Sequence, residues 1–509
     1  MKNVIFAVLV LAIAAVSGCR CMKGKTAGMG CASAKAYTAD WESLAKHNEA
    51  PDWFRDAKFG IYFHWGVYSV PAFGSEWYPR NMHLKDKMEY AHHLKTYGDP
   101  SVFGYHDFVP MFKAEHFDAE DWAKLFKQAG AKFAGPVAEH HDGFSMWASK
   151  LTPWNAKDMG PKRDIVGEME KAIRKNDMKF ITTFHHAFNG QHPARMTNPN
   201  KYPTGYYTPA PGWPTASDDP KLRMLYGRMP REEFLNLWLG KLVEVIDAYR
   251  PDIIWFDGCL TGIPDRDKQQ FCAYYFNKAA ERNRQVVVTY KGTSLPREVG
   301  VEDFEKGRAD HLTDYVWLTD DTISKGSWCY TKDLKIKPTE EVLHSLIDIV
   351  SKNGVLLLNI SPMADGTIPN NQRQVLLEMG QWLKVNGVAI YNTRPWKKYG
   401  QGPTDIGRGG HFIKWTGRYT AQDIRFTHSR DGATLYAICL GWPTEAFTIA
   451  DATVSPGGKA KITLLGSKAK VAYTINADKS LTIQPPAIED SQLPCKYAYV
   501  FKIEGFEIK

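Results

Sequence analysis

The feature that most constrains the fold of this chain is a repeated alternation of short β-rich runs with longer amphipathic stretches, from about residue 55 to 385. The runs with strand character are Lys58–His64, Lys132–Ala138, Met178–Phe184, Asp252–Phe256, Gln285–Tyr290, Asp314–Leu318 and Val355–Asn359. Between them lie stretches with helical periodicity, such as Glu232–Tyr249. This alternation predicts parallel strands joined by helical crossovers.

We expect these elements to form an α/β fold of the TIM-like (β/α)8 barrel type rather than an open doubly wound sheet. No Gly-rich nucleotide loop follows the first strand, and polar residues follow several different strands. Seven strands can be placed, and the eighth cannot. After Trp396 short β-rich runs such as His411–Trp415 alternate with turn residues, which is typical of an antiparallel β-sandwich. We therefore expect a barrel over 45–394 and a C-terminal sandwich over 395–509.

The first residues have a different character. An apolar run, Val4–Val16, follows Lys2 and is too short to span a bilayer as a stable helix. It ends in Val16-Ser17-Gly18-Cys19, which resembles a bacterial lipobox with cleavage before Cys19. The alternative is an ordinary signal peptide cut near Gly18. We expect a lipoprotein signal peptide over 1–18 and a polar tether over 19–44. The protein would then lie in the cell envelope, attached to a membrane only through a lipid on Cys19.

Charge and cysteine content exclude some classes of function. The 64 Lys and Arg exceed the 56 Asp and Glu by a net charge of +8, which is spread along the chain. A nucleic-acid-binding protein usually concentrates positive charge on one stripe, so no nucleic-acid partner is expected. The cysteines after residue 40 are scattered singly, without the CxxC pairs of metal or redox sites. They do not form a disulfide framework, although one or two bridges remain open.

Ionisable side chains follow four of the predicted strands in succession, where catalytic groups of such barrels lie. They occur in His64-Trp65-Gly66, Glu139-His140-His141-Asp142, His185-His186 and Asp257-Gly258. Metal-dependent barrel hydrolases usually carry two histidines one residue apart on the first strand, whereas this strand supplies one. We therefore favour sugar binding by imidazoles and tryptophans, with one carboxylate attacking the anomeric carbon and a second carboxyl group as acid and base.

Several longer motifs strongly resemble family 29 of the glycoside hydrolases, the α-L-fucosidases. They are Trp53–Gly66, Ser75–Tyr78, Glu139–Phe144, Ser327–Tyr330, Ser351–Pro362 and Asp365–Pro369. The resemblance covers about residues 45–400, and the remainder is similar to that family's C-terminal β-domain. It implies a retaining exo-glycosidase that removes terminal α-linked L-fucose from glycans through a covalent fucosyl–aspartate, with no metal and no organic cofactor. The alternatives are a glycosidase for α-galactoside-like substrates and a glycan-binding lipoprotein with a decayed site.

The resemblance also assigns roles to residues. Asp257 matches the family's nucleophile, and Trp255 lies two residues before it, as in the family. Residues that match ligands of the sugar or line its pocket are His64, Glu76, Trp77, His140, His141 and Trp255.

The sequence departs from the family pattern at two places. Thr183-Phe184 precedes His185-His186 where many members have paired tyrosines, so we expect His185, or else His186, to replace the tyrosine contact. The acid/base falls in a loop that aligns poorly, here 301–310. Glu305 is the preferred candidate, with Glu302 and Asp303 as alternatives. Outside the assigned set, Lys291, Arg308 and Trp317 are further candidates to approach the pocket.

Overall fold

The computed structural model describes residues 37–190, 207, 209–405, 407–413, 418–450, 452–454 and 460–507. The predicted signal peptide and Cys19 lie outside these residues, as does most of the tether. The end of the predicted tether is already part of the folded domain. The Tyr37 N–H donates to Asn277 Oδ1 at 2.7 Å, and helix α1 (Trp41–Leu44) buries Leu44 completely. The predicted tether boundary at residue 44 is therefore wrong by at least eight residues.

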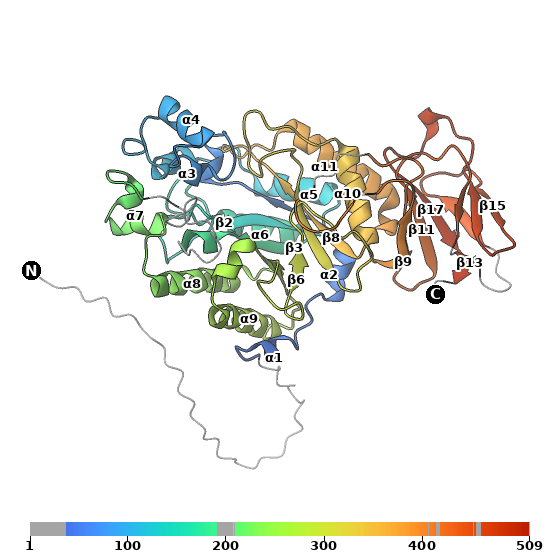
Figure 1. Cartoon of the computed structure of the whole chain (residues 1–509), viewed down its shortest axis with the longest axis horizontal. Coiled ribbons are helices and arrows are strands. Elements are labelled where there is room, and N and C mark those ends of the chain that lie inside the picture. The colour runs from blue at the N-terminus through green and yellow to red at the C-terminus, as the bar shows by residue number, and fades with distance from the viewer. Residues whose placement is uncertain are drawn as a thin grey trace, which may run out of the picture. The chain divides into compact units, whose positions relative to one another are not determined.

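Eight parallel strands close into a barrel, which confirms the predicted TIM-like fold (Figure 1). The strands are β1 (Phe59–Phe63), β2 (Phe133–Glu139), β3 (Lys179–Phe184), β4 (Ile253–Phe256), β5 (Val287–Lys291), β6 (Val301–Asp303), β7 (Trp317–Thr322) and β8 (Gly354–Ile360). Their spatial order follows the chain, and β8 pairs with β1 to close the ring. The carboxyl ends of all eight strands therefore meet at one rim.

The strand that the sequence did not reveal is β6. It has only three residues, two of them acidic, so it lacks both the length and the apolar character that identify a buried strand. Asp303 nevertheless pairs with Lys291 of β5 on one side and with Leu318 of β7 on the other. The charged loop predicted to hold the acid/base therefore begins inside the barrel wall.

Helices cover the outside of the barrel. The longer ones are α5 (Ala119–Gln128), α6 (Ile165–Lys175), α8 (Arg231–Tyr249), α9 (Asp265–Ala280), α10 (Thr339–Ser351) and α11 (Asn370–Asn386). The shorter ones are α2 (Asp52–Ala57), α3 (Tyr78–Asn81), α4 (Met88–Thr96) and α7 (Pro220–Leu225). Helix α5 begins as predicted, because Asp118 accepts the N–H groups of Glu120 and Asp121. In the described part of the chain, no helix combines the length and apolarity needed to cross a bilayer.

The barrel interior is a packed core with a polar upper end. Alternate residues of all eight strands point inward. They form a buried cluster inside the barrel, separate from the core between the strands and the helices; its members include Tyr62, Ile181, Trp255 and Leu357. Because this cluster fills the interior, the open space lies above it, at the carboxyl rim of the strands.

The C-terminal part is antiparallel, as predicted. One sheet has the order β14 (Lys461–Leu464), β17 (Tyr499–Glu504), β11 (Thr434–Cys439), β10 (Ile424–Ser429), β9 (Thr393–Gln401). A second has the order β12 (Phe447–Ile449), β16 (Leu481–Gln484), β15 (Ala472–Ile475), and β13 (Thr453–Val454) pairs with β18 (Phe506–Glu507). The strand expected at His411–Trp415 is absent from its described part, residues 411–413, and the rest of that run lies outside the described residues.

A buried carboxylate joins the barrel to the C-terminal sheet. Asp348 of α10 contacts Lys352 of the same helix, Arg425 of β10 and Arg308 of the loop after β6. Burial alone would raise the pKa of Asp348, but these three cations hold it well below its usual range.

The five cysteines among the described residues are all free thiols; they are Cys259, Cys272, Cys329, Cys439 and Cys495.

Candidate active site

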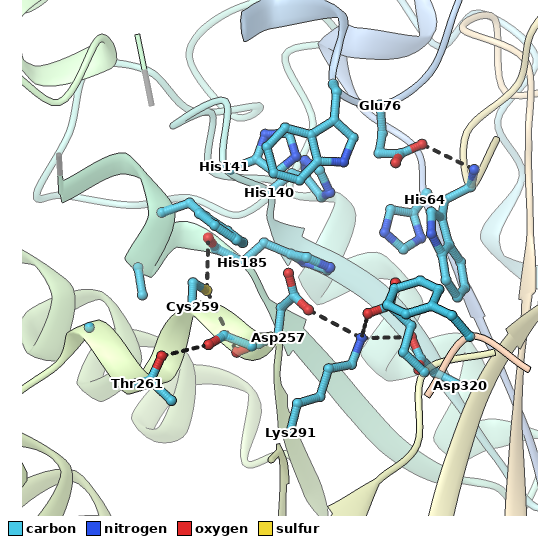
Figure 2. Close-up of a pocket in the computed structure, with 18 residues that line it drawn as sticks. His64, Glu76, His140, His141, His185, Asp257, Cys259, Thr261, Lys291 and Asp320 are labelled. Carbon is cyan, nitrogen blue, oxygen red and sulfur yellow. Dashed lines mark hydrogen bonds and ion pairs between the residues drawn. The ribbon is translucent and has the colours of Figure 1, made fainter. Parts of the chain in front are cut away.

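A cavity of about 380 Å³ opens at the carboxyl rim of the barrel strands. Eight of the nine predicted site residues line it, namely His64, Glu76, Trp77, His140, His141, His185, Asp257 and Glu305. They come from positions between 64 and 305, so the closure of the barrel brings them together. Figure 2 shows the four histidines on one side of Asp257 and Lys291 on the other.

Asp257 presents its carboxylate to the cavity at the end of β4. It precedes a short 3-10 helix, Gly258–Gly262, but its side chain makes no capping hydrogen bond to that helix. Its Oδ1 instead lies 3.1 Å from the Lys291 Nζ. The carboxylate is therefore available to react rather than occupied as a helix cap, the structural role an aspartate at this position most often has.

Lys291, at the end of β5, is the electrostatic centre of the site. Besides Asp257, its Nζ lies 2.8 Å from Glu305 Oε2, 3.3 Å from Asp320 Oδ2 and 3.9 Å from Asp303 Oδ2. Burial alone would lower the pKa of Lys291, but the four carboxyl groups raise it well above its usual range. The lysine therefore carries a positive charge, and dashed lines in Figure 2 join its Nζ to Asp257 and Asp320.

One ammonium cannot balance four carboxylates, so some of these groups hold protons. Burial, together with Asp320, raises the pKa of Asp303 well above its usual range. Burial raises the pKa of Glu305 to about 7, with Lys291 opposing the rise and the charges of Asp320 and Asp257 adding to it. Near neutral pH the cavity thus holds the Lys291 ammonium and, in Glu305, a carboxyl group whose pKa is close to the pH of the solution.

The structure separates the three acids of the loop that the sequence left as alternatives. Glu302 points to Arg297, 3.4 Å away, and does not line the cavity. Asp303 is fully buried inside the barrel and accepts the Trp255 Nε1–H at 3.1 Å. Glu305 lines the cavity. Of the three, Glu305 has the position that an acid/base requires.

Asn359 fixes the tautomer of His64. Asn359 Nδ2 donates to the Trp328 carbonyl at 2.7 Å, so Asn359 Oδ1 faces His64. That oxygen lies 2.8 Å from His64 Nδ1, which must therefore carry the proton. Burial lowers the pKa of His64 to about 3. The ring is consequently neutral, and its Nε2 presents a lone pair that can accept a hydrogen bond.

The remaining histidines of the cavity form a compact, uncharged group. The rings of His140 and His141 are 3.6 Å apart, and those of His140 and His185 are 4.3 Å apart. Burial lowers the pKa of all three well below the usual range. Neutral imidazoles both donate and accept, so this wall suits a ligand rich in hydroxyl groups.

The choice between His185 and His186 is resolved by their directions. His185 lines the cavity. His186 stacks on Trp238 beneath helix α8, and its Nε2 lies 3.3 Å from the Trp238 carbonyl oxygen. His185 is thus the residue positioned to replace the expected tyrosine contact.

Glu76 and Trp77 close the cavity from the loop before α3. Glu76 Oε2 accepts the Trp328 N–H at 3.0 Å, and burial raises the pKa of Glu76. The Trp77 ring lies 4.2 Å from that of His141.

Trp255 differs from expectation, because it is fully buried and absent from the described lining of the cavity. It lies beneath Lys291, whose Nζ is 4.8 Å from its ring centre, and supports the site from below.

Several lining residues were not predicted. Asp320 was missed because the sequence indicated a strand ending at Leu318, whereas β7 continues to Thr322. Three other lining residues lie in or near the predicted motifs, but their side chains gave no reason to expect them in the site; they are Phe188, Cys259 and Trp328. Phe412 comes from the C-terminal part of the chain. Of the further candidates, Lys291 lies in the site, whereas Arg308 and Trp317 are absent from the described lining.

One nitrogen from each of His64, His140 and His185 lies within 4.8 Å of the other two. Three neutral imidazoles at that spacing resemble a histidine metal site, although zinc would require each nitrogen at about 2.0–2.1 Å. The same three groups can instead bind sugar hydroxyls. The arrangement of the histidines alone does not separate these uses.

Comparisons with known proteins show which family the chain is similar to. The family model described as Alpha-L-fucosidase matches residues 27–388, and the model for the Alpha-L-fucosidase C-terminal domain matches 418–504. Human tissue alpha-L-fucosidase is 31% identical over 485 residues, covering 92% of each chain. Human plasma alpha-L-fucosidase is 32% identical over 480 residues, covering 92% of this chain and 93% of the relative.

Solved structures agree with the sequence comparisons. The Thermotoga maritima alpha-fucosidase in complex with fucose superposes with a TM-score of 0.70 at 30% identity, covering 92% of this chain and 99% of that one. The same enzyme in complex with a mechanism-based inhibitor gives a TM-score of 0.71, covering 92% and 100%.

The charge balance around Lys291 can be tested directly. Lys291→Met removes the ammonium that opposes the rise in the pKa of Glu305, so this pKa should move from about 7 to a higher value. The measurement is a pH titration of the Glu305 side-chain carboxyl ¹³C signal, assigned by its loss in Glu305→Gln. Lys306→Met is the matched control, because the Lys306 Nζ lies over the Trp328 ring instead. An unchanged or lowered pKa in Lys291→Met would contradict the account.

Proposed function

The chain belongs to the alpha-L-fucosidase family and hydrolyses α-linked L-fucose, and we propose that it acts as a retaining exo-glycosidase with Asp257 as nucleophile and Glu305 as acid/base. The fucose would be terminal and linked to a glycan. No metal or organic cofactor takes part in the proposed mechanism.

One observation carries the proposal: Asp257 and Glu305 contact the same nitrogen. Because their oxygens lie 3.1 and 2.8 Å from Lys291 Nζ, they can be no more than about 6 Å apart, below the roughly 6.5–9.5 Å of inverting enzymes. Inverting enzymes need that extra space for a water molecule between the carboxyl group and the sugar. The shorter separation favours direct attack by Asp257, as in retaining enzymes with about 5–5.5 Å.

In the first step, the Asp257 carboxylate forms a bond to the anomeric carbon while the bond from that carbon to the leaving oxygen breaks. Glu305 transfers its proton to the leaving oxygen, which departs as an alcohol. A pKa of about 7 lets Glu305 hold this proton near neutral pH. The products are a covalent fucosyl–aspartate and a Glu305 carboxylate, which Lys291 stabilises.

In the second step, Glu305 accepts a proton from water as the water oxygen attacks the anomeric carbon. The bond to Asp257 breaks, and fucose leaves with its original configuration. The negative charge of Asp257 contributes to the raised pKa of Glu305. That contribution disappears while Asp257 is esterified, so Glu305 changes from an acid in the first step to a base in the second.

The histidine wall would bind the hydroxyl groups of the fucose. The neutral His64 offers its Nε2 as an acceptor, and His140, His141 and His185 are uncharged as well. A decayed glycan-binding site is disfavoured, because both carboxyl groups needed for hydrolysis line the cavity.

The role of Asp257 can be tested by removing its side chain. Asp257→Gly should lower kcat by roughly a thousandfold or more, because no group remains to form the covalent intermediate. Added azide should restore turnover by attacking the open face, giving β-L-fucosyl azide as product. Thermal unfolding should remain cooperative. A variant that keeps more than a few per cent of wild-type activity without azide would remove Asp257 from this role.

The role of Glu305 can be tested by the leaving group. Glu305→Ala should greatly slow hydrolysis of fucosides with an alkyl or sugar leaving group, but much less the release of an activated phenol, which departs without protonation. In the wild type, kcat/KM on a sugar fucoside should fall as the pH rises through about 7, because Glu305 loses its proton, and this limb should be absent in the variant. Glu302→Ala is the matched control, since Glu302 pairs with Arg297 outside the cavity.

We further propose that the enzyme is a lipid-anchored protein of the cell envelope. The support is the run Val16-Ser17-Gly18-Cys19 after a short apolar segment. Cys19→Ala should move activity from the membrane fraction to the soluble fraction, or leave the precursor unprocessed, with fractionation and mass spectrometry as the measurements. A wild-type protein found wholly soluble after export would contradict the anchor.

A further inference from the structure

A segment of the C-terminal part, Gly409–Ile413, reaches back to the loop that carries Glu305. Gly410 and Arg308 form an isolated antiparallel bridge, with the Gly410 N–H donating to the Arg308 carbonyl at 2.9 Å. The Ile413 N–H donates to the Lys306 carbonyl at 3.0 Å. Residues 411–413, the described part of the strand predicted at His411–Trp415, therefore bond to the loop that carries Glu305 instead.

Both backbone groups of Glu305 are bonded to this segment. The Glu305 N–H donates to His411 Nδ1 at 3.0 Å, and the Glu305 carbonyl accepts the Phe412 N–H at 2.7 Å. The approach is so close that a Cβ on Gly307 would lie 1.9 Å from the Gly410 oxygen. The position of Phe412 is thus fixed relative to Glu305.

Phe412 has an exposure and a conformation that packing does not explain. Its side chain is 60% exposed, and among the described residues it is the one large exposed hydrophobic side chain that lines the cavity. Its φ of 52° lies in the left-handed region, where a bulky residue is rare. A strained backbone that holds an exposed aromatic ring at a cavity points to contact with a ligand.

We propose that Phe412 forms the leaving-group subsite, where its ring stacks on the sugar to which the fucose is attached. This inference rests on the proposed function, in which Glu305 protonates the oxygen between the two sugars. That oxygen must lie within hydrogen-bonding distance of Glu305, and the second sugar begins on its far side. Phe412 is bonded to Glu305 through the backbone and lines the same cavity, so its ring is next to that position.

The chemistry of the ring fits a sugar. The electron-rich face of a phenyl ring attracts the C–H face of a pyranose, and exposed aromatic surface gains from losing water. The fucose hydroxyls are matched by imidazoles, whereas the leaving group would be recognised by an apolar platform. The subsite therefore favours a pyranose over a small alcohol as leaving group.

Two substrates separate a stacking platform from a residue that merely positions Glu305. An α-L-fucosyl disaccharide and methyl α-L-fucoside both need protonation of a poor leaving group, but only the disaccharide has a ring to stack. Phe412→Ala should lower kcat/KM for the disaccharide by roughly tenfold and for the methyl fucoside by less than about twofold. Phe412→Tyr should retain the preference. Leu377→Ala, at an exposed site on α11, is the matched control and should change neither value.

Alanine and tyrosine both keep a Cβ at position 412, so the backbone cost of the left-handed conformation is similar in each variant. An equal loss on both substrates would show that Phe412 acts through Glu305 and would overturn the proposal. No loss on the disaccharide would overturn it as well. Failure of the wild type to hydrolyse either fucoside would contradict the proposed function itself, which is a different result from lost selectivity in the variant.

Discussion

The active site depends on the ion pairs of one buried cation, the ammonium group of Lys291. A buried lysine is costly unless opposite charges surround it, and here Asp257, Asp303, Glu305 and Asp320 do so. These carboxyl groups come from the end of β4, from β6, from the loop after β6, and from β7, which pairs with β6. Strand order thus brings the four acids around one cation, and the excess of carboxyl groups keeps a proton on Glu305 near neutral pH.

The second constraint comes from outside the barrel. The loop after β6 carries Glu305, the proposed acid/base, but has little regular structure of its own, since β6 ends at Asp303. Hydrogen bonds from Gly409–Ile413 fix the backbone of Glu305. The proposed nucleophile is therefore held at the end of a barrel strand, and the proposed acid/base is held by contact between two parts of the chain. Through these bonds the C-terminal part positions a side chain of the cavity.

Much of the site could be predicted from the sequence, for a physical reason. Parallel barrel strands end at one rim, so polar residues after successive strands, such as His64, His140, His185 and Asp257, must converge. The sequence-based predictions failed for segments whose structure is set by contacts with residues far away in the chain. β6 is too short and too acidic to be recognised as a strand, and the run containing Phe412 has β character although the described part of it is bonded to the catalytic loop instead.

The central claim is that Asp257 attacks the sugar directly, with Glu305 close enough to exclude an intervening water. The stereochemistry of hydrolysis tests it most directly. Proton NMR during the first minutes of the reaction, before mutarotation, should show α-L-fucose as the first product, because two displacements restore the original configuration. β-L-Fucose as the first product would mean a single displacement by water and would contradict the roles assigned to both carboxyl groups.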